Sequence, residues 1–198
     1  LPSDREGMPD LAEALGLPLS DVVRRVEAMG EYNPMLGMRG VRLGVTVPEI
    51  YEMQARAIFE AIVHVSDEGI SVIPEIMIPL VSAKREVELV KKRVASVASQ
   101  VSLETSKDVN YKLGVMVETP RAALRASDIA MNSEFLSFGT NDLTQMAYGL
   151  SRDDAGRFMS QYVQQGVFQE DPFHILDAEG VGELVKLGAD RARSIKSD

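Results

Sequence analysis

The chain has 198 residues, of which 45% are hydrophobic and 26% are charged, as expected for a globular protein with a sizeable core. Its formal net charge of -9 argues against a nucleic-acid or anionic-membrane surface, and its lack of cysteine excludes disulfide and thiolate chemistry within it. No apolar run approaches the ~20 residues of a membrane span, and the start has no signal-peptide pattern but resembles a piece of a longer protein.

Two short helices are predicted first. One covers 10–15 and ends at Gly16, and the second begins at Ser20 and stops near Pro34. A short strand over 38–44 is predicted next, because Arg39, Val41 and Leu43 alternate there among glycines.

A long amphipathic helix should follow, since Thr46 and Glu49 have the spacing of a capping box. The rest of the chain alternates between short apolar strands and amphipathic helices. Strands are predicted over 75–80, 112–118 and 134–139, and helices over 84–101, 121–131, 143–149, 154–165 and 177–193. Strands that are apolar on both faces, each followed by a helix, indicate an α/β fold with a parallel sheet. No linker is evident, so a single domain over 1–198 is predicted.

Polar groups follow three of the four predicted strands. Arg39 and Arg42 belong to the first, Glu118 ends the third, and Gly139-Thr140-Asn141-Asp142 ends the fourth. The second ends in Pro79 and offers no functional side chain. In a parallel α/β array, functional groups gather at the carboxyl ends of strands, so these residues should share one edge of the sheet.

Glu118 and Asp142 are candidate metal ligands. They follow neighbouring strands and have no histidine or cysteine beside them, which suits a hard divalent cation, Mg2+ or Mn2+, whose remaining positions are filled by substrate and water. The alternative is that each carboxylate caps the helix that follows it.

An anion site is predicted beside these acids. Gly139 lets the chain turn off its strand, and the N–H groups at the start of the next helix favour an anion. Arg39, Arg42 and Arg152 are candidate anion clamps, because the planar guanidinium matches carboxylate and phosphate. The alternatives are a plain strand-to-helix turn for "GTND" and an ion pair of Arg152 with Asp153 or Asp154.

Four segments together resemble the phosphoenolpyruvate-utilising enzymes. They are "NPMLGMRGVRLGVTVPEIYEMQARAIFEA", "EIMIPL", "GVMVETPRAAL" and "FLSFGTNDLTQMAYGLSRDDAGRF". Within that group the chain is most similar to the C-terminal domain of the pyruvate, phosphate dikinases, and less similar to phosphoenolpyruvate synthase and to enzyme I of the sugar phosphotransferase system. The resemblance implies a (β/α)8 barrel of the TIM type, present only in part, at roughly strands 3 to 6.

The resemblance also implies roles for single residues. Glu118 and Asp142 would bind Mg2+. The substrate, pyruvate or phosphoenolpyruvate, would be bound by a larger set: Arg39, Arg42, Ser137, Gly139, Thr140, Asn141, Asp142 and Arg152. Of these, Arg39, Asn141 and Arg152 would take part in catalysis. Mg2+ would act as a Lewis acid that stabilises the enolate during phosphoryl transfer. The parent reaction interconverts ATP, phosphate and pyruvate with AMP, diphosphate and phosphoenolpyruvate.

The chain departs from the family pattern at two places. Met38 stands where the family has a histidine, and the cysteine that donates a proton to the enolate would lie on a strand beyond Asp198. We therefore expect a fragment that is inactive alone, whose partners are the phosphohistidine domain of the same enzyme and a second copy in a dimer or larger assembly. The cytoplasm is the expected compartment, or an organelle in some eukaryotic relatives. The rival hypotheses are a phosphoenolpyruvate synthase fragment and a non-catalytic dimerisation module.

Overall fold

The computed structural model describes residues 6–196 and divides the chain into two compact units, 1–37 and 38–198. The first unit contains α1 (Met8–Leu15), α2 (Leu19–Ala28) and the short 3-10 helix η1 (Pro34–Leu36). Met8, Ala12 and Val22 form its small core. Both predicted helices are confirmed, although α2 ends earlier than expected. The single domain over 1–198 stays a prediction.

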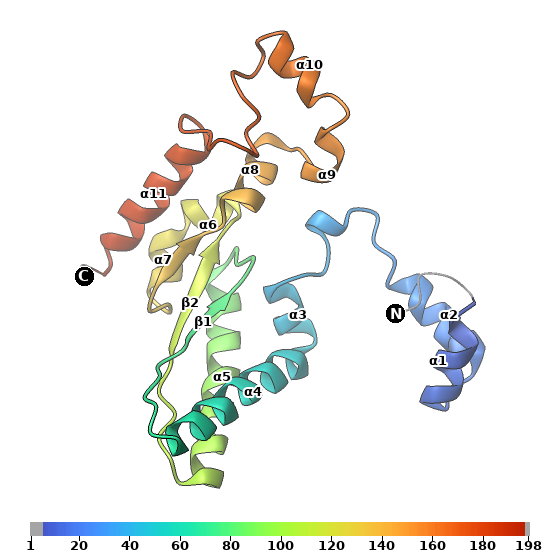
Figure 1. Ribbon diagram of the computed structural model, residues 1–198, viewed down its shortest axis with the longest axis vertical. Helices are drawn as coiled ribbons and strands as arrows, with labels where there is room; N and C mark the ends of the chain where they lie inside the picture. The colour runs from blue at the N-terminus through green and yellow to red at the C-terminus, as the bar shows by residue number, and fades with distance from the viewer. Residues whose placement is uncertain (1–5, 197–198) are drawn as a thin grey trace. The chain divides into compact units, whose positions relative to one another are not determined.

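The second unit is an α/β structure around a parallel sheet in the order β1-β2-β3 (Figure 1). Its elements are α3 (Val41–Thr46), α4 (Pro48–Asp67), β1 (Glu75–Ile78), α5 (Lys84–Thr105), β2 (Lys112–Val117), α6 (Pro120–Leu124), α7 (Ala126–Ala130), β3 (Leu136–Phe138), α8 (Thr140–Tyr148), α9 (Arg152–Ala155), α10 (Met159–Gln164) and α11 (Val181–Arg193). Among the residues described, no helix has both the length and the apolar character needed to cross a membrane.

The predicted strand over 38–44 is wrong. Gly40 adopts a left-handed φ of 55°, and the chain enters α3 at Val41. The Val41 N–H donates to the carbonyl of Pro79 at 3.0 Å, while the Arg42 N–H turns back to the carbonyl of Arg39 at 3.2 Å. The segment thus contacts the end of β1 without forming a ladder beside it. The α/β class with a parallel sheet is confirmed, whereas the TIM-type barrel stays a prediction.

The predicted capping box at Thr46 is also wrong. The Thr46 hydroxyl donates to the carbonyl of Arg42 at 2.7 Å, so this side chain belongs to the end of α3. The following helix, α4, begins at Pro48, whose fixed φ and missing N–H suit the first position of a helix. Proline therefore marks this helix start in place of the hydroxyl.

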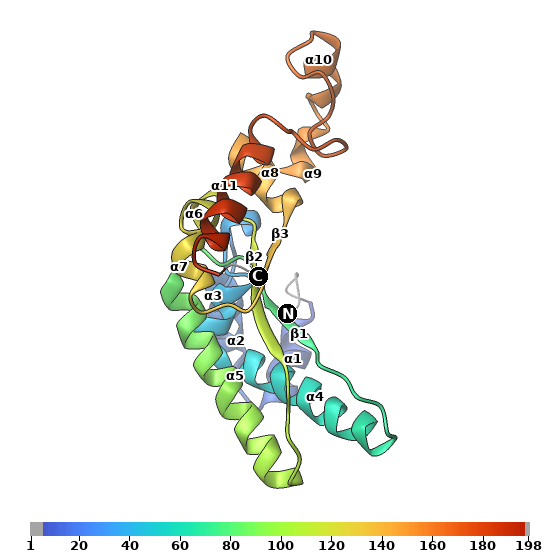
Figure 2. The same cartoon turned by 90° about the vertical axis from the view of Figure 1, so that its left-hand side faces the viewer.

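The core lies between the sheet and the helices on one side of it. Five valines of α5 at helical spacing are buried there, and Phe59 and Ile62 of α4 join the same cluster. Figure 2 shows α5, α6 and α7 on the same side of the three strands. One face of β1 is not covered, because the apolar side chain of Met77 is 40% exposed.

We expect Gly114→Ala to destabilise the sheet. A Cβ atom at Gly114 would lie 2.5 Å from the Phe135 ring and 2.5 Å from the Phe135 carbonyl oxygen, so β2 and the segment before β3 would have to separate. Overpacking of this kind costs about 1–3 kcal/mol. The measurement is the free energy of unfolding in urea. Gly156→Ala is the control, because a Cβ there meets nothing within 4 Å, and equal effects of the two changes would contradict the prediction.

Asp177 should stabilise the start of α11 in a way that acid removes. Burial alone would raise the pKa of its carboxyl, but hydrogen bonds from main-chain N–H groups, including those of Gly180 and Val181, and from the Tyr148 hydroxyl bring the pKa below its ordinary value of 3.8. Its stabilisation is therefore complete above pH 3.8 and is lost as the pH falls through the lower, folded-state pKa. Asp177→Ala should cost about 1 kcal/mol at neutral pH, as caps usually do.

The matched variant is Asp177→Asn, which keeps an acceptor oxygen but cannot titrate. It should lose less stability than Asp177→Ala, and its difference from the parent chain should shrink on acidification. Urea unfolding at several pH values measures both effects. If the free energies of unfolding of Asp177→Ala and the parent chain differ by the same amount at every pH, this account of the cap is wrong.

Candidate functional site

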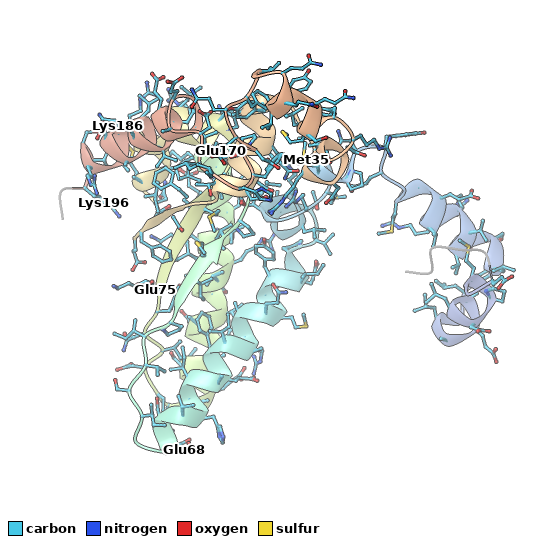
Figure 3. The ribbon with its side chains drawn as sticks, turned by 45° about the horizontal axis from the view of Figure 1, so that its top comes forward. Met35, Glu68, Glu75, Glu170, Lys186 and Lys196 are labelled. Carbon is cyan, nitrogen blue, oxygen red and sulfur yellow. The ribbon has the colours of Figure 1, made fainter. Side chains whose placement is uncertain are left out.

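Glu118 and Asp142 lie at the same end of the sheet. Glu118 directly follows β2, and Asp142 lies in the first turn of α8, shortly after β3. These strands are parallel neighbours, with Val117 opposite Phe138, so their carboxyl ends coincide. In Figure 3 the labelled Glu170 lies toward this end of the sheet, and the labelled Glu68 marks the opposite end.

Glu118 packs against two main-chain groups. Its Oε1 accepts a hydrogen bond from the N–H of Leu80 at 2.6 Å. Its Oε2 lies so close to Gly139 that a Cβ atom added there would be only 2.6 Å away. Gly139 is therefore required for close approach at this site, because any larger side chain would displace the carboxylate.

The turn after β1 supplies the donor to Glu118. Leu80 has a left-handed φ of 59°, which is strained for a bulky side chain, and it is 1% exposed. A Cβ at Gly40 would lie 2.8 Å from the Leu80 Cβ. The turn that carries Arg39 therefore packs against the turn that contains Leu80. We expected the strand ending in Pro79 to offer no functional side chain. Its contribution is instead a main-chain N–H.

The surroundings of Glu118 disfavour the charged form of its carboxyl. Burial raises the pKa of its carboxyl above the ordinary value, and the negative charge of Asp142 raises it further. The Leu80 N–H and the positive charge of Arg39 act in the opposite direction without cancelling this effect. The two acids thus repel each other across this end of the sheet, and a cation between them would relieve the repulsion.

Asp142 is almost fully buried, at 6% exposure. Its Oδ1 accepts hydrogen bonds from the amide groups of Asn141 at 3.2 Å and Gln145 at 3.0 Å. Its Oδ2 lies 2.9 Å from Arg39 Nη2, which makes an ion pair by distance. This contact lacks hydrogen-bond geometry, so within residues 6–196 Oδ2 accepts no hydrogen bond.

Arg152 lies on the far side of Asn141 from this acid pair. Its Nη1 donates to Asn141 Oδ1 at 2.8 Å, and its guanidinium carbon lies 5.9 Å from the centre of the Phe173 ring. A hollow of about 370 Å3 opens here, lined by Thr140 and Arg152 among others. The predicted alternative, an ion pair with Asp153 or Asp154, is replaced by the hydrogen bond to Asn141.

The other residues predicted to bind substrate are Arg42, Ser137 and Thr140. Arg42 is in the first turn of α3, and it is Arg39 that pairs with Asp142. Ser137 is the middle residue of β3, opposite Met116, and points away from the core that Leu136 and Phe138 contact. Thr140 opens α8.

The alternative in which both acids act as helix caps is not supported by the contacts. Thr119, the residue after Glu118, caps α6 by accepting from the N–H of Ala122 at 3.1 Å. The hydrogen bonds to Asp142 come from side-chain amides. The two carboxylates therefore have contacts that helix capping does not explain.

Sequence reasoning missed Leu80 and Gln145. The spacing of Gln145 from Asp142, one helical turn, could have indicated that they contact each other, since residues three apart share a helix face. Nothing in the sequence indicates that a leucine adopts a left-handed conformation, because this conformation depends on the surrounding packing.

The residues present fit a hard divalent cation. Within residues 6–196, no group of three or more His, Cys, Asp or Glu side chains could hold a metal by itself. Glu118 and Asp142 offer carboxylate oxygens, and Asp142 Oδ2 is buried without a hydrogen bond. Mg2+ is commonly held by one or two carboxylates, with substrate and water as the other ligands, and this donor set matches that pattern.

The chain is similar to a known family of enzymes along nearly its whole length. The family model described as "PEP-utilising enzyme, PEP-binding domain" matches residues 5–196. The chain is 50% identical over 198 residues to pyruvate, phosphate dikinase of Rhizobium meliloti (strain 1021). The aligned region covers 100% of this chain and 22% of that protein.

Two further relatives have the same name. Pyruvate, phosphate dikinase of Clostridium symbiosum is 49% identical over 197 residues, covering 99% of this chain and 22% of the relative. The chloroplastic pyruvate, phosphate dikinase 1 of Oryza sativa subsp. japonica is 51% identical over 187 residues, covering 94% of this chain and 20% of the relative. The chain thus spans about a fifth of the length of these relatives. Because the family model matches nearly the whole chain, the chain belongs to the PEP-utilising enzymes, in the region of their PEP-binding domain.

Proposed function

We propose that this chain forms the part of a pyruvate, phosphate dikinase that binds pyruvate or phosphoenolpyruvate together with Mg2+. The observation that carries the proposal is Asp142 Oδ2, a buried carboxylate oxygen that accepts no hydrogen bond within the described residues, meets only the Arg39 guanidinium and lies beside a second acid. Buried polar atoms are normally satisfied, and those that are not often mark a site for an ion. The three relatives named above are pyruvate, phosphate dikinases, which supports this choice of enzyme over phosphoenolpyruvate synthase.

Glu118 and Asp142 would hold the metal ion. Leu80 fixes one oxygen of Glu118, and the amides of Asn141 and Gln145 fix one oxygen of Asp142, so each acid keeps a second oxygen for coordination. Bound Mg2+ would supply a Lewis acid for the oxygens of pyruvate. Arg39 would balance the charge of Asp142 when no metal is bound and would bind the substrate phosphate when it is.

The substrate anion would lie beside the acids. Arg152 and Asn141 line the hollow of about 370 Å3, together with Thr140 at the start of α8. Gly139, Ser137 and Arg42 would complete the set of substrate contacts. Guanidinium and amide donors suit a carboxylate or phosphate, which agrees with the small anionic substrates of this proposal.

The complete reaction needs groups outside the chain. The chain has no cysteine, so it cannot supply the proton donor that the resemblance implies, and the phosphohistidine domain would be a separate part of the same enzyme. We therefore propose that this chain binds substrate and metal but does not catalyse the reaction alone. The complete barrel and the homodimer belong to the parent enzyme in this proposal.

The first test measures binding of pyruvate to the purified chain by calorimetry, with Mg2+ and with EDTA. Pyruvate should bind only when Mg2+ is present, and Glu118→Gln and Asp142→Asn should each weaken Mg2+ binding by about 10-fold or more. Asp153→Asn is the control, because Asp153 is an exposed acid on α9. Pyruvate binding that is equal in EDTA, or no binding at all, would favour the non-catalytic module instead.

The second test uses Gly139→Ala. The added methyl group would lie 2.6 Å from Glu118 Oε2, so the carboxylate would have to move away from its position beside Asp142. We expect Mg2+ affinity to fall about 10-fold, as when a group that orients a ligand is disturbed. Gly156→Ala serves as the control because it meets no neighbour within 4 Å. Mg2+ affinity unchanged in a folded Gly139→Ala chain would show that Glu118 does not bind the metal.

A further inference from the structure

Gln145 connects two parts of the candidate site that lie on different helices. Its Nε2 donates to Asp142 Oδ1 at 3.0 Å within α8. Its Oε1 accepts from the main-chain N–H of Arg152, the first residue of α9, at 2.8 Å. One side chain thus contacts the proposed metal ligand and the start of the helix that carries the proposed anion clamp.

This arrangement uses both ends of a buried amide. Gln145 is 7% exposed, and burying a primary amide costs free energy unless its donors and acceptor find partners. The contact with Asp142 follows from helix periodicity, since the two residues are one turn apart. The contact with Arg152 does not, because α8 ends at Tyr148, Gly149 is left-handed and Arg152 belongs to the next helix.

The network closes through Asn141. Arg152 Nη1 donates to Asn141 Oδ1 at 2.8 Å, and Asn141 Nδ2 donates to Asp142 Oδ1 at 3.2 Å. Asp142 Oδ1 is therefore engaged by two amides, which leaves Oδ2 as the oxygen that meets a cation, Arg39 in this structure. An apolar side chain in place of Gln145 would release both the carboxylate and the Arg152 main chain.

We propose that Gln145 is a positioning residue that sets the orientation of the Asp142 carboxylate and the place of Arg152 at the same time. The metal half of this inference rests on the proposed function, whereas the link to Arg152 does not. Gln145 would make the metal-binding and anion-binding halves of the site dependent on each other, because loss of one side chain would loosen both.

The experiment compares Gln145→Met, which is similar in length and can make neither hydrogen bond, with Gln145→Glu, which keeps the acceptor for the Arg152 N–H. Gln164→Met is the control, since Gln164 is an exposed glutamine on α10. Two readouts are used on the whole chain: Mn2+ affinity by titration, and hydrogen exchange of the Arg152 amide by NMR on 15N-labelled protein. Thermal unfolding of each variant is recorded beside them.

In Gln145→Met we expect Mn2+ to bind about 10-fold more weakly and the Arg152 amide to exchange about 10-fold faster. In Gln145→Glu the acceptor for the Arg152 N–H remains, although its carboxylate repels that of Asp142. The Arg152 amide should therefore exchange more slowly than in Gln145→Met or, where Gln145→Met does not fold, less than about 10-fold faster than in the parent chain. Gln164→Met should change neither readout.

Two results would overturn the inference. One is a Gln145→Met chain with a lower melting temperature but unchanged Mn2+ affinity and Arg152 protection, which means that Gln145 only fills space. The other is equal loss of Arg152 protection in Gln145→Glu and Gln145→Met. If the parent chain binds no Mn2+, the proposed metal site fails, but the Arg152 readout still decides whether Gln145 fixes α9.

Discussion

Arg39 Nη2 lies 2.9 Å from Asp142 Oδ2, and Glu118 adds a second negative charge at the same end of the sheet. Two carboxylates out of water repel each other and are stable only beside a cation or hydrogen-bond donors. Every unusual local feature at this end of the sheet serves that requirement. Leu80 and Gln145 provide donors, Gly139 provides space, and the Gly40 turn carries Arg39 to the acids.

The backbone is strained at the residue that donates to Glu118. Leu80 has a left-handed φ of 59° while its side chain is buried, and its N–H reaches Glu118 Oε1. Strained conformations persist only where surrounding contacts determine them, and they concentrate at functional sites. Here Leu80 is buried, at 1% exposure, and Gly40 approaches it closely. The geometry of Glu118 is thus set by packing on both sides of one turn.

The acid pair and the arginines lie on elements of the second unit, 38–198, so the proposed site is built within one compact body. Its donor set has few protein oxygens, and Arg152 lines the hollow beside Asn141. In our proposal such a site would bind Mg2+ weakly without substrate and more tightly with it, since the substrate would complete the coordination shell. That dependence suits a domain that spans about a fifth of its dikinase relatives and receives a phosphoryl group from another part of the enzyme in our proposal.

The sequence by itself determined the three parallel strands, the valine face of α5, and the carboxyl-end positions of Glu118 and Asp142, because hydrophobic periodicity and strand-end polarity are local properties. It misassigned 38–44 as a strand, since the left-handed Gly40 and the start of α3 depend on contact with the Pro79–Leu80 turn. It also could not reveal the Leu80 N–H or the link from Gln145 to Arg152. Those are contacts between groups brought together by tertiary packing, and only the folded structure fixes which donor meets which acceptor.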